Sequence, residues 1–244
     1  MPSFLKDIKE GRAADGGLLQ RNGYTLLQYR KEGTTKFQEM TWDDYRRGTA
    51  EEGMEPNLED LENAEAFWLG LDKMSDMTSE GRWELIVIVR SHSNPTQSYC
   101  IYKDFKVGSE LHGYPLTLSH RNQELCTGIF EEPNNDENRD ERGDIFQQYS
   151  RYKPFSTPDH DNDDNSENCA KKRRAGWWFG STADNINEEE VCNGLCLNCG
   201  STRLANSYEE IIFSQTHMGM KRMEPEVPEN PENPENPEDP NPWI

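Results

Sequence analysis

The sequence predicts an α+β fold built on a central antiparallel sheet, with a few short helices and a loop-rich last third. The most apolar and β-branched segment, Trp83–Val89, has the composition of a buried strand. The segments with helical spacing are short, and residues typical of loops dominate after residue 131. Strands grouped in mid-chain with few helices around them are typical of antiparallel α+β domains.

Each expected element rests on a local pattern. Four segments combine apolar runs or alternation with flanking turn residues and are expected to be strands: 23–29, 83–89, 99–102 and 114–118. Thr41 is placed to cap a short helix over Trp42–Arg47, and Gly48 is placed to end it. A second short helix is expected to end near Thr78, with Leu71, Met74 and Met77 on its apolar face.

Composition and charge exclude several classes of protein. The 244 residues contain 46 Asp and Glu against 26 Lys and Arg, which gives a formal net charge of −20. This excess of acid argues against nucleic acid or anionic lipid as a partner. No apolar run approaches the about 18 residues that a membrane span needs, so membrane insertion is not expected. Six Trp and 10% aromatic residues argue against a wholly disordered chain.

The acid is concentrated in segments outside the expected core. From Glu224 onward the chain repeats Pro, Glu and Asn and contains seven acids and no base. Proline prevents such a repeat from forming a helix or a central strand. We expect one folded domain over residues 1–222 and a disordered tail over residues 223–244. A second acidic segment, residues 131–144, is expected to be an exposed loop.

Six cysteines form an even set: Cys100, Cys126, Cys169, Cys192, Cys196 and Cys199. An even number favours disulfides and an oxidising compartment, but sequence alone cannot give their pairing. The last three could also hold zinc, although no His lies near them, which makes zinc the weaker alternative. The first residues lack the apolar core of a signal peptide, so composition leaves the compartment open.

The strongest chemical signal is the segment 155–169, where acids alternate with other polar residues. Such oxygen-rich loops suit Ca²⁺, which takes about six to eight oxygen ligands. An EF-hand register fails, because counting from Asp159 places Asp164 at the glycine position and Ala170 at the glutamate position. The register two residues later fails at the same positions. Spacing alone leaves a calcium loop and a solvated acidic turn as alternatives.

Two further segments follow this loop. The basic residues 171–174, beside aromatic rings, hint at phosphate or nucleic acid, but their acidic surroundings favour a solvated, partly neutralised turn. The three rings of Trp177–Phe179 are more often core than ligand platform. The chain has no hydrolase, zinc-protease or phosphate-loop motif, and its five histidines are scattered among polar residues and expected at the surface. We therefore expect no enzymatic activity.

Seven segments, in order and over roughly residues 20–215, resemble the fibrinogen C-terminal domain of ficolins, tachylectins, angiopoietins, tenascins and invertebrate fibrinogen-related lectins. They are residues 23–37, 41–48, 65–78, 83–89, 99–118, 155–170 and 175–178. The most specific are FWLGLDK, FSTPDHDNDDNSENCA and AGWW. The resemblance implies a central twisted antiparallel sheet with a loop-rich, calcium-binding C-terminal subdomain.

The resemblance also implies the ligands of the calcium ion. The side chains of Asp161 and Asp163 would bind it, and the backbone carbonyls of Asn165 and Glu167 would complete the site. The ion would then order a region that has little core of its own.

A recognition pocket is implied beside the calcium segment. In the family, the cysteine corresponding to Cys169 pairs with a cysteine just after the aromatic motif, and a His usually follows that partner. Thr182 and Ala183 stand at those two positions here. Cys169 therefore lacks its usual partner, and one of the cysteines at 192, 196 or 199 could replace it.

Three residues are the candidates for ligand binding: Arg173, Thr182 and Tyr208. Lys172 and Arg173 occupy positions where fibrin-type members carry pocket residues, and Tyr208 falls near another pocket position. A positively charged rim would suit an anionic ligand such as sialic acid or an acidic peptide. The alternative is that the pocket has been lost.

The chain also departs from the family at both ends. The family's opening cysteine pair and first strands are missing, which suggests an N-terminal truncation. The usual closing hairpin is expected to be shortened to about residues 216–223. Cys100 and Cys126 lie outside the usual family positions and are candidates for a lineage-specific bridge.

The sequence thus predicts a secreted, calcium-stabilised, non-enzymatic lectin of innate immunity that binds acetylated or anionic glycans. The alternative is a receptor ligand or matrix adhesion domain that binds a cell-surface protein, as the angiopoietin and tenascin branches do. The sequence leaves a homo-oligomer open.

Overall fold

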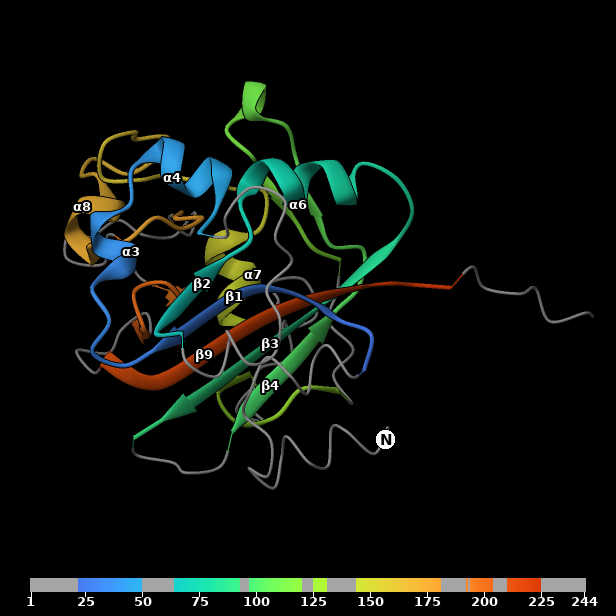
Figure 1. The fold of residues 1–244 in the computed structure, drawn as a ribbon. Helices are drawn as coiled ribbons and strands as arrows, with labels where there is room; N and C mark the ends of the chain where they lie inside the picture. Colours follow the sequence, from blue (N-terminus) through green and yellow to red (C-terminus); the bar gives the residue numbers. More distant parts are fainter. Residues whose placement is uncertain are drawn as a thin grey trace, which may run out of the picture.

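The computed structural model describes residues 22–49, 64–92, 97–119, 125–130, 144–180, 192, 194–203 and 210–224. Within them, seven strands form one antiparallel sheet in the order β2-β1-β9-β3-β4, with β8 also paired to β9 and β7 paired to β8 (Figure 1). A separate two-stranded sheet joins β5 to β6. The expected α+β class and antiparallel sheet are confirmed.

The strands are β1 Thr25–Lys31, β2 Ala66–Trp68, β3 Trp83–Ser91, β4 Ser98–Tyr102, β5 Lys106–Val107, β6 Leu116–Thr117, β7 Gly194–Cys196, β8 Ser201–Arg203 and β9 Glu210–Arg222. The helices are α3 Lys36–Glu39, α4 Trp42–Arg47, α6 Leu71–Thr78, α7 Ile145–Ser150 and α8 Cys169–Arg173, with 3₁₀ turns η1 Glu110–His112 and η3 Gly128–Phe130. The strand expected at 114–118 is reduced to β6, because Tyr114 adopts a positive φ of 51° that no regular strand allows.

β9 is the central strand of the sheet. It pairs with β1 from Thr25 opposite Met220 to Lys31 opposite Gln215, and it pairs with β3 along its other edge. The expectation of a shortened closing hairpin at 216–223 is therefore wrong, because residues 216–222 belong to this long interior strand. The same burial corrects the placement of His217, which is 1% exposed and packs against the Tyr29 ring.

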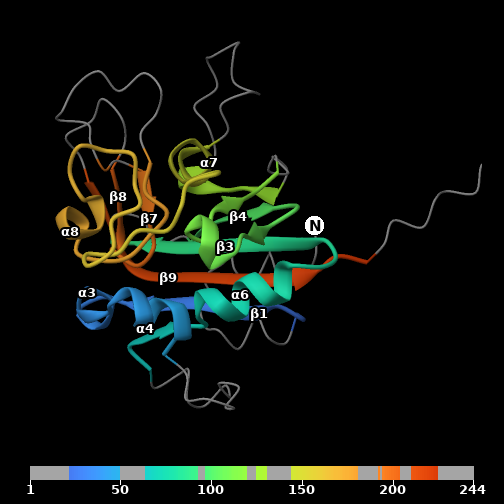
Figure 2. The same ribbon diagram turned by 90° about the horizontal axis from the view of Figure 1, so that it is seen from above.

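The two expected helices are confirmed as α4 and α6, and Figure 2 shows α3, α4 and α6 gathered on the β1 side of β9. Thr41 caps α4 as expected. Its hydroxyl accepts from the Asp44 backbone N–H, and the Asp44 carboxylate accepts from the Thr41 backbone N–H at 2.8 Å. This reciprocal pair satisfies donors that a helix start otherwise leaves unpaired.

An aromatic cluster joins the loop-rich last third to the N-terminal half. Phe155 lies 5.0 Å from the Trp178 ring and 5.7 Å from the Trp68 ring, and Trp177 lies 5.2 Å from Trp178. All four side chains are at most 1% exposed, which confirms that these rings are core. Tyr45 of α4 extends the link, because its hydroxyl accepts from the Gly176 backbone N–H at 2.8 Å.

Three disulfides use all six cysteines: Cys100–Cys126, Cys169–Cys192 and Cys196–Cys199. The first confirms the bridge suggested for that pair. The second shows that Cys169 has found a substitute partner among the later cysteines. Because the three cysteines from 192 to 199 are all oxidised, they do not form a zinc site.

The acidic loop expected at 131–144 lies outside the described residues except for Asp144. That residue is 3% exposed, caps α7 and accepts from the Tyr102 hydroxyl at 2.8 Å, so it is part of the core rather than of an exposed loop. Residues 1–21 and all of the tail beyond Glu224 also lie outside the described part. No helix in that described part is long and apolar enough to cross a bilayer.

Candidate calcium segment and cationic surface

The calcium segment, residues 155–168, has no regular secondary structure and is held at both ends. At its start, Ser156 exchanges backbone hydrogen bonds with Trp177, with N···O distances of 2.9 and 3.0 Å. At its end, the Asn168 side chain accepts from the Lys171 backbone N–H at 2.8 Å and so caps α8. These hydrogen bonds fix one end of the segment to the aromatic cluster and the other end to α8.

Asp159 ties this segment to α4. Its carboxylate accepts from the Trp42 backbone N–H at 3.0 and 3.2 Å and from the Thr157 hydroxyl at 2.7 Å. An acid at the start of a helix is favourable because it meets unpaired N–H groups there. Asp159 therefore has a structural role that its place in the acidic run does not reveal.

Asp161 and Asp163, the two expected side-chain ligands, lie close together. The Asp163 backbone N–H donates to Asp161 Oδ1 at 3.4 Å. The Asp163 carboxylate is oriented by the Cys169 N–H at 3.0 Å and by Asn165 at 3.1 Å. Burial raises the pKa of the Asp163 carboxyl, and the Asp161 charge adds to the increase, although the hydrogen bonds from Cys169 and Asn165 oppose it.

Two further acids of the segment, Asp164 and Glu167, are neutralised by lysines. Asp164 pairs with Lys153 at 2.6 Å, and Glu167 pairs with Lys172 at 2.9 Å. Among the described residues, no cation pairs with Asp161 or Asp163.

The two expected carbonyl ligands also lack partners. Within the same residues, no hydrogen bond uses the backbone carbonyl of Asn165 or Glu167. Among the described residues, the Asp161 and Asp163 carboxylates therefore have no cation partner, and the Asn165 and Glu167 carbonyls have no hydrogen-bond donor. No cluster of three or more His, Cys, Asp or Glu side chains suited to a metal occurs in the described ranges, so any ion here would depend on carbonyls as well as on the two carboxylates.

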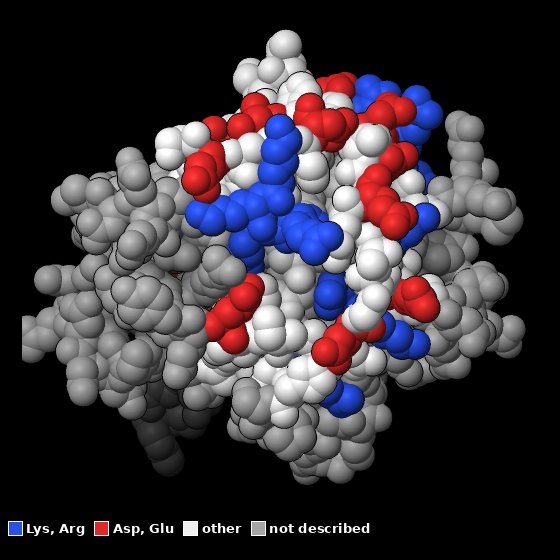
Figure 3. All heavy atoms as spheres, turned by 90° about the vertical axis from the view of Figure 1, so that its left-hand side faces the viewer, with Lys and Arg blue, Asp and Glu red and all other residues white. Residues whose placement is uncertain are grey.

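α8 presents three exposed cations: Lys171, Lys172 and Arg174. We call these residues the cationic surface. Lys172 pairs with Glu167, whereas neither Lys171 nor Arg174 has an ion-pair partner in the described part of the chain. Figure 3 faces the side on which α8 lies and shows Lys and Arg side chains gathered there with Asp and Glu around them.

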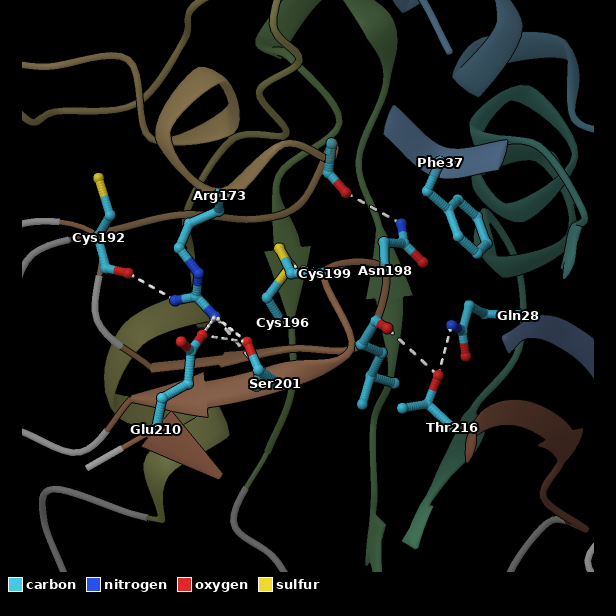
Figure 4. Close-up of a disulfide and its surroundings, with 12 residues drawn as sticks. Gln28, Phe37, Arg173, Cys192, Cys196, Asn198, Cys199, Ser201, Glu210 and Thr216 are labelled. Atoms are coloured by element: carbon cyan, nitrogen blue, oxygen red, sulfur yellow. Dashed lines mark hydrogen bonds and ion pairs between the residues drawn. A yellow bond between two sulfur atoms is a disulfide. The ribbon is translucent and has the colours of Figure 1, made fainter. Parts of the chain in front are cut away.

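Arg173 does not belong to that surface. Its side chain is 3% exposed, and its guanidinium donates to Cys192 O at 2.7 Å and to Ser201 Oγ at 3.1 Å, with Glu210 4.0 Å away (Figure 4). The expected place on a pocket rim is therefore not what the structure shows. Arg173 instead fastens α8 to β8 and to the segment of the Cys169–Cys192 disulfide.

Thr182 and Tyr208, the other two ligand-binding candidates, lie outside the described residues. The disulfide nevertheless bears on Thr182. The cysteine that pairs with Cys169 is Cys192, ten positions after Thr182. The residue that follows Cys192 is Asn193 rather than His. The partner of Cys169 is therefore not at the position of Thr182, and the ligand-binding role expected for Thr182 stays a prediction.

Sequence reasoning missed a hollow beside the start of the calcium segment. Its volume is about 390 Å³, and its lining includes Trp42, Glu110, Leu111, His112, His160 and Asn162. The Trp42 and His160 rings stack at 4.3 Å, and the Trp42 indole donates to Glu110 at 3.3 Å. Three segments that are far apart in the sequence form this hollow, so no single sequence motif predicts it.

Comparison with known proteins gives a consistent result. The family described as the C-terminal globular domain of fibrinogen beta and gamma chains matches residues 19–196. Tenascin-R of Gallus gallus is 31% identical over 203 residues, which are 83% of this chain and 11% of tenascin-R. The fibrinogen alpha chain of Mus musculus is 33% identical over 170 residues, which are 68% of this chain and 19% of that relative.

Two of the solved structures with the same fold serve as examples. The fibrinogen-like globe domain of human ANGPTL6 has a TM-score of 0.54 at 23% identity, covering 83% of this chain and 79% of that domain. Lamprey fibrin D-dimer complexed with the peptide Gly-His-Arg-Pro-amide has a TM-score of 0.53 at 20% identity, covering 88% of this chain and 67% of that one.

The chain spans only about a tenth of tenascin-R, at 11% of its length. What is shared is therefore one domain and not a whole protein. The matched residues include the strands β1 to β4, the calcium segment, α8 and the Cys169–Cys192 bridge. This chain belongs to the family of fibrinogen C-terminal globular domains.

Proposed function

We propose that this domain is an extracellular, non-enzymatic recognition module that binds an anionic glycan at the cationic surface of α8. The observation that carries the proposal is the exposure of Lys171, Lys172 and Arg174 on a chain whose net charge is −20. Cations gathered on one face steer and hold carboxylate or sulfate groups even when the rest of the surface is acidic. Three disulfides support an extracellular location, because such bonds persist in oxidising compartments.

We further propose that Ca²⁺ organises this surface. The carboxylates of Asp161 and Asp163, with the carbonyls of Asn165 and Glu167, offer hard oxygen atoms to the ion, and oxygen is its preferred ligand. The support is that neither carboxylate has a lysine or arginine partner, whereas their neighbours Asp164 and Glu167 do. An ion held there would fix the segment that leads directly into α8.

A protein ligand is the second candidate, and the comparisons support it as well as they support the first. Tenascin-R matches most of this chain, and the lamprey fibrin structure of the same fold contains a bound peptide. An acidic protein segment would meet the same cations as a sulfated or sialylated glycan. This candidate differs from the first in the class of ligand and not in the surface used.

A glycan array with matched variants tests the proposal. The domain is applied with calcium and with EDTA, alongside the variant Lys171→Gln/Arg174→Gln and the control Lys103→Gln/Lys106→Gln, which removes two other exposed lysines. We expect sialylated or sulfated glycans to be bound in calcium, and the α8 variant to lose at least about tenfold in affinity while the control keeps it. Absence of glycan binding, or equal loss in both variants, would contradict the glycan proposal.

A further inference from the structure

Two cysteines enclose a short turn that the proposed function does not use. Cys196, Leu197, Asn198 and Cys199 form a C-x-x-C turn between β7 and β8, and its disulfide spans a sequence separation of 3 (Figure 4). The other two disulfides span separations of 26 and 23. This turn therefore differs from the two long-range bridges in that it hardly constrains the rest of the chain.

The two sulfur atoms of the turn differ in access. All six cysteines lie in the described part of the chain, and five of them are at most 7% exposed. Cys199 is the exception, because it is only partly buried against the core, whereas its partner Cys196 is fully buried. Reagents in solution therefore reach Cys199 first.

The buried partner is arranged to be a good leaving group. The Cys199 backbone N–H donates to Cys196 Sγ at an N···S distance of 3.1 Å. A donor aimed at sulfur stabilises the thiolate more than the thiol. Because a disulfide opens faster when the departing sulfur is a stable thiolate, attack on Cys199 is favoured.

A half-buried cation, Arg30, lies against the same turn. The Arg30 guanidinium of β1 packs so tightly on Gly200, the residue after Cys199, that a methyl group there would collide with it. One of its terminal nitrogens is buried without a hydrogen-bond partner among the described residues. An unsatisfied guanidinium beside a C-x-x-C turn favours the thiolate form of its cysteines.

From these contacts we propose that Cys196–Cys199 is a thiol–disulfide exchange site, which an external dithiol opens while the domain remains folded. A thiolate of the dithiol attacks Cys199 Sγ, and the bond to Cys196 breaks with its electron pair moving to Cys196 Sγ, which takes a proton from solvent. The second thiol of the reagent then attacks the mixed disulfide and releases Cys199. Two electrons and two protons pass to the protein, and the reagent becomes a disulfide.

Hydrogen bonds that do not involve sulfur keep the turn in place after reduction. Gly200 N donates to the carbonyls of Cys196 at 3.1 Å and Leu197 at 3.0 Å, and Gly200 O accepts from Phe213 N at 2.8 Å. The Asn198 amide donates to Gly176 O at 2.9 Å, next to the aromatic cluster. Reduction therefore acts on the turn that leads into Ser201, the residue that holds Arg173 and α8.

Differential alkylation tests the proposal on the intact chain. The native protein is equilibrated in buffers of oxidised and reduced dithiothreitol, quenched with acid, labelled with N-ethylmaleimide and mapped by peptide mass spectrometry. We expect label on Cys196 and Cys199 at dithiol levels at least about tenfold below those that open the other pairs, with an unchanged far-UV circular dichroism spectrum. Opening of all three pairs together, or only on unfolding, would overturn the proposal.

Two arginine variants test the electrostatic part. Arg30→Gln should shift the exchange equilibrium toward the disulfide by at least about threefold, whereas Arg30→Lys, which keeps the charge, should behave as wild type. Arg47→Gln, which removes an exposed arginine paired with Asp43, is the control and should change nothing. Equal reducibility of Arg30→Gln and wild type would remove the charge argument and count against the site.

Discussion

Arg173 and its neighbour Arg174 show how differently two adjacent cations can be used. Arg173 is buried and donates to Cys192 O and Ser201, while Arg174 ends α8 with a positive φ of 60° and an exposed side chain. In the sequence the two are indistinguishable members of one basic run. Only the position of β8 and Cys192 beside α8 decides which of them is a structural residue.

A substitution pair tests this assignment. Arg173→Gln leaves the carbonyl of Cys192 and the Ser201 side chain without their buried donor, so the free energy of unfolding should fall by about 2 kcal/mol or more. Arg174→Gln should change it by less than about 0.5 kcal/mol, as is usual at exposed positions. Urea unfolding followed by tryptophan fluorescence measures both, and equal effects would show that Arg173 does not anchor α8.

Sequence reasoning at this scale succeeded for residues whose environment is local. Thr41 needed only a helix start beside it, and it caps α4 as expected. His217 and Asp144 were placed at the surface from their polar neighbours in the chain, but β9 and the Tyr102 hydroxyl bury them from a distance. The burial of a side chain by residues far away in the sequence cannot be predicted from its neighbours in the chain.

At the scale of elements, α4 links the sheet to the calcium segment. Its first N–H groups are satisfied by Thr41, Asp44 and Asp159, and its buried Tyr45 reaches Gly176. The helix has only six residues, so these caps and contacts hold it rather than its intrinsic propensity. Loosening the cap should therefore affect the segment that it supports.

The capping pair has a predictable dependence on pH. Thr41→Ala should lower the free energy of unfolding by about 1 kcal/mol at neutral pH. The hydrogen bonds from Thr41 lower the pKa of the Asp44 carboxyl, so its contribution is present above the unfolded-state pKa and is lost as the pH falls through the folded-state value.

The difference in stability between wild type and Asp44→Asn should accordingly be constant from pH 7 to about pH 5 and shrink below about pH 4. Thermal unfolding at a series of pH values measures it, with Asp76→Asn on α6 as an exposed control. A difference that grows as the pH falls would have the wrong sign for a depressed pKa.

Among the elements, α4, α6 and β3 were predictable from the sequence, and the long central strand β9 was not. α4 has its own capping pair, α6 has its own apolar spacing, and β3 is apolar along most of its length. β9 contains Ser, Gln, Thr, His and Gly among its apolar residues, because its pairing with β1 and β3 and its burial come from the whole sheet. A strand in the interior of a sheet is expected to be largely apolar, so a segment with many polar residues is a weak sequence signal for one.

For the whole molecule, the family resemblance gave the architecture, and the structure changed the picture of the candidate site. Arg173, expected on a pocket rim, is buried, and Cys169 pairs with Cys192. The other two pocket candidates, Thr182 and Tyr208, lie outside the described residues. The surface that remains is the cationic one on α8, with a hollow at the other end of the same segment. We propose that both depend on how the calcium segment is ordered.

Isothermal titration of CaCl₂ into the domain tests that dependence most directly, with Asp163→Asn as the ligand variant and Asp164→Asn as its neighbour control. We predict one site in wild type and in Asp164→Asn, and at least about tenfold weaker binding in Asp163→Asn. At 100 times the dissociation constant, calcium should add about 2.7 kcal/mol to the stability of the proteins that bind it. Absence of calcium binding in wild type, or equal binding in both variants, would contradict a calcium-organised recognition surface.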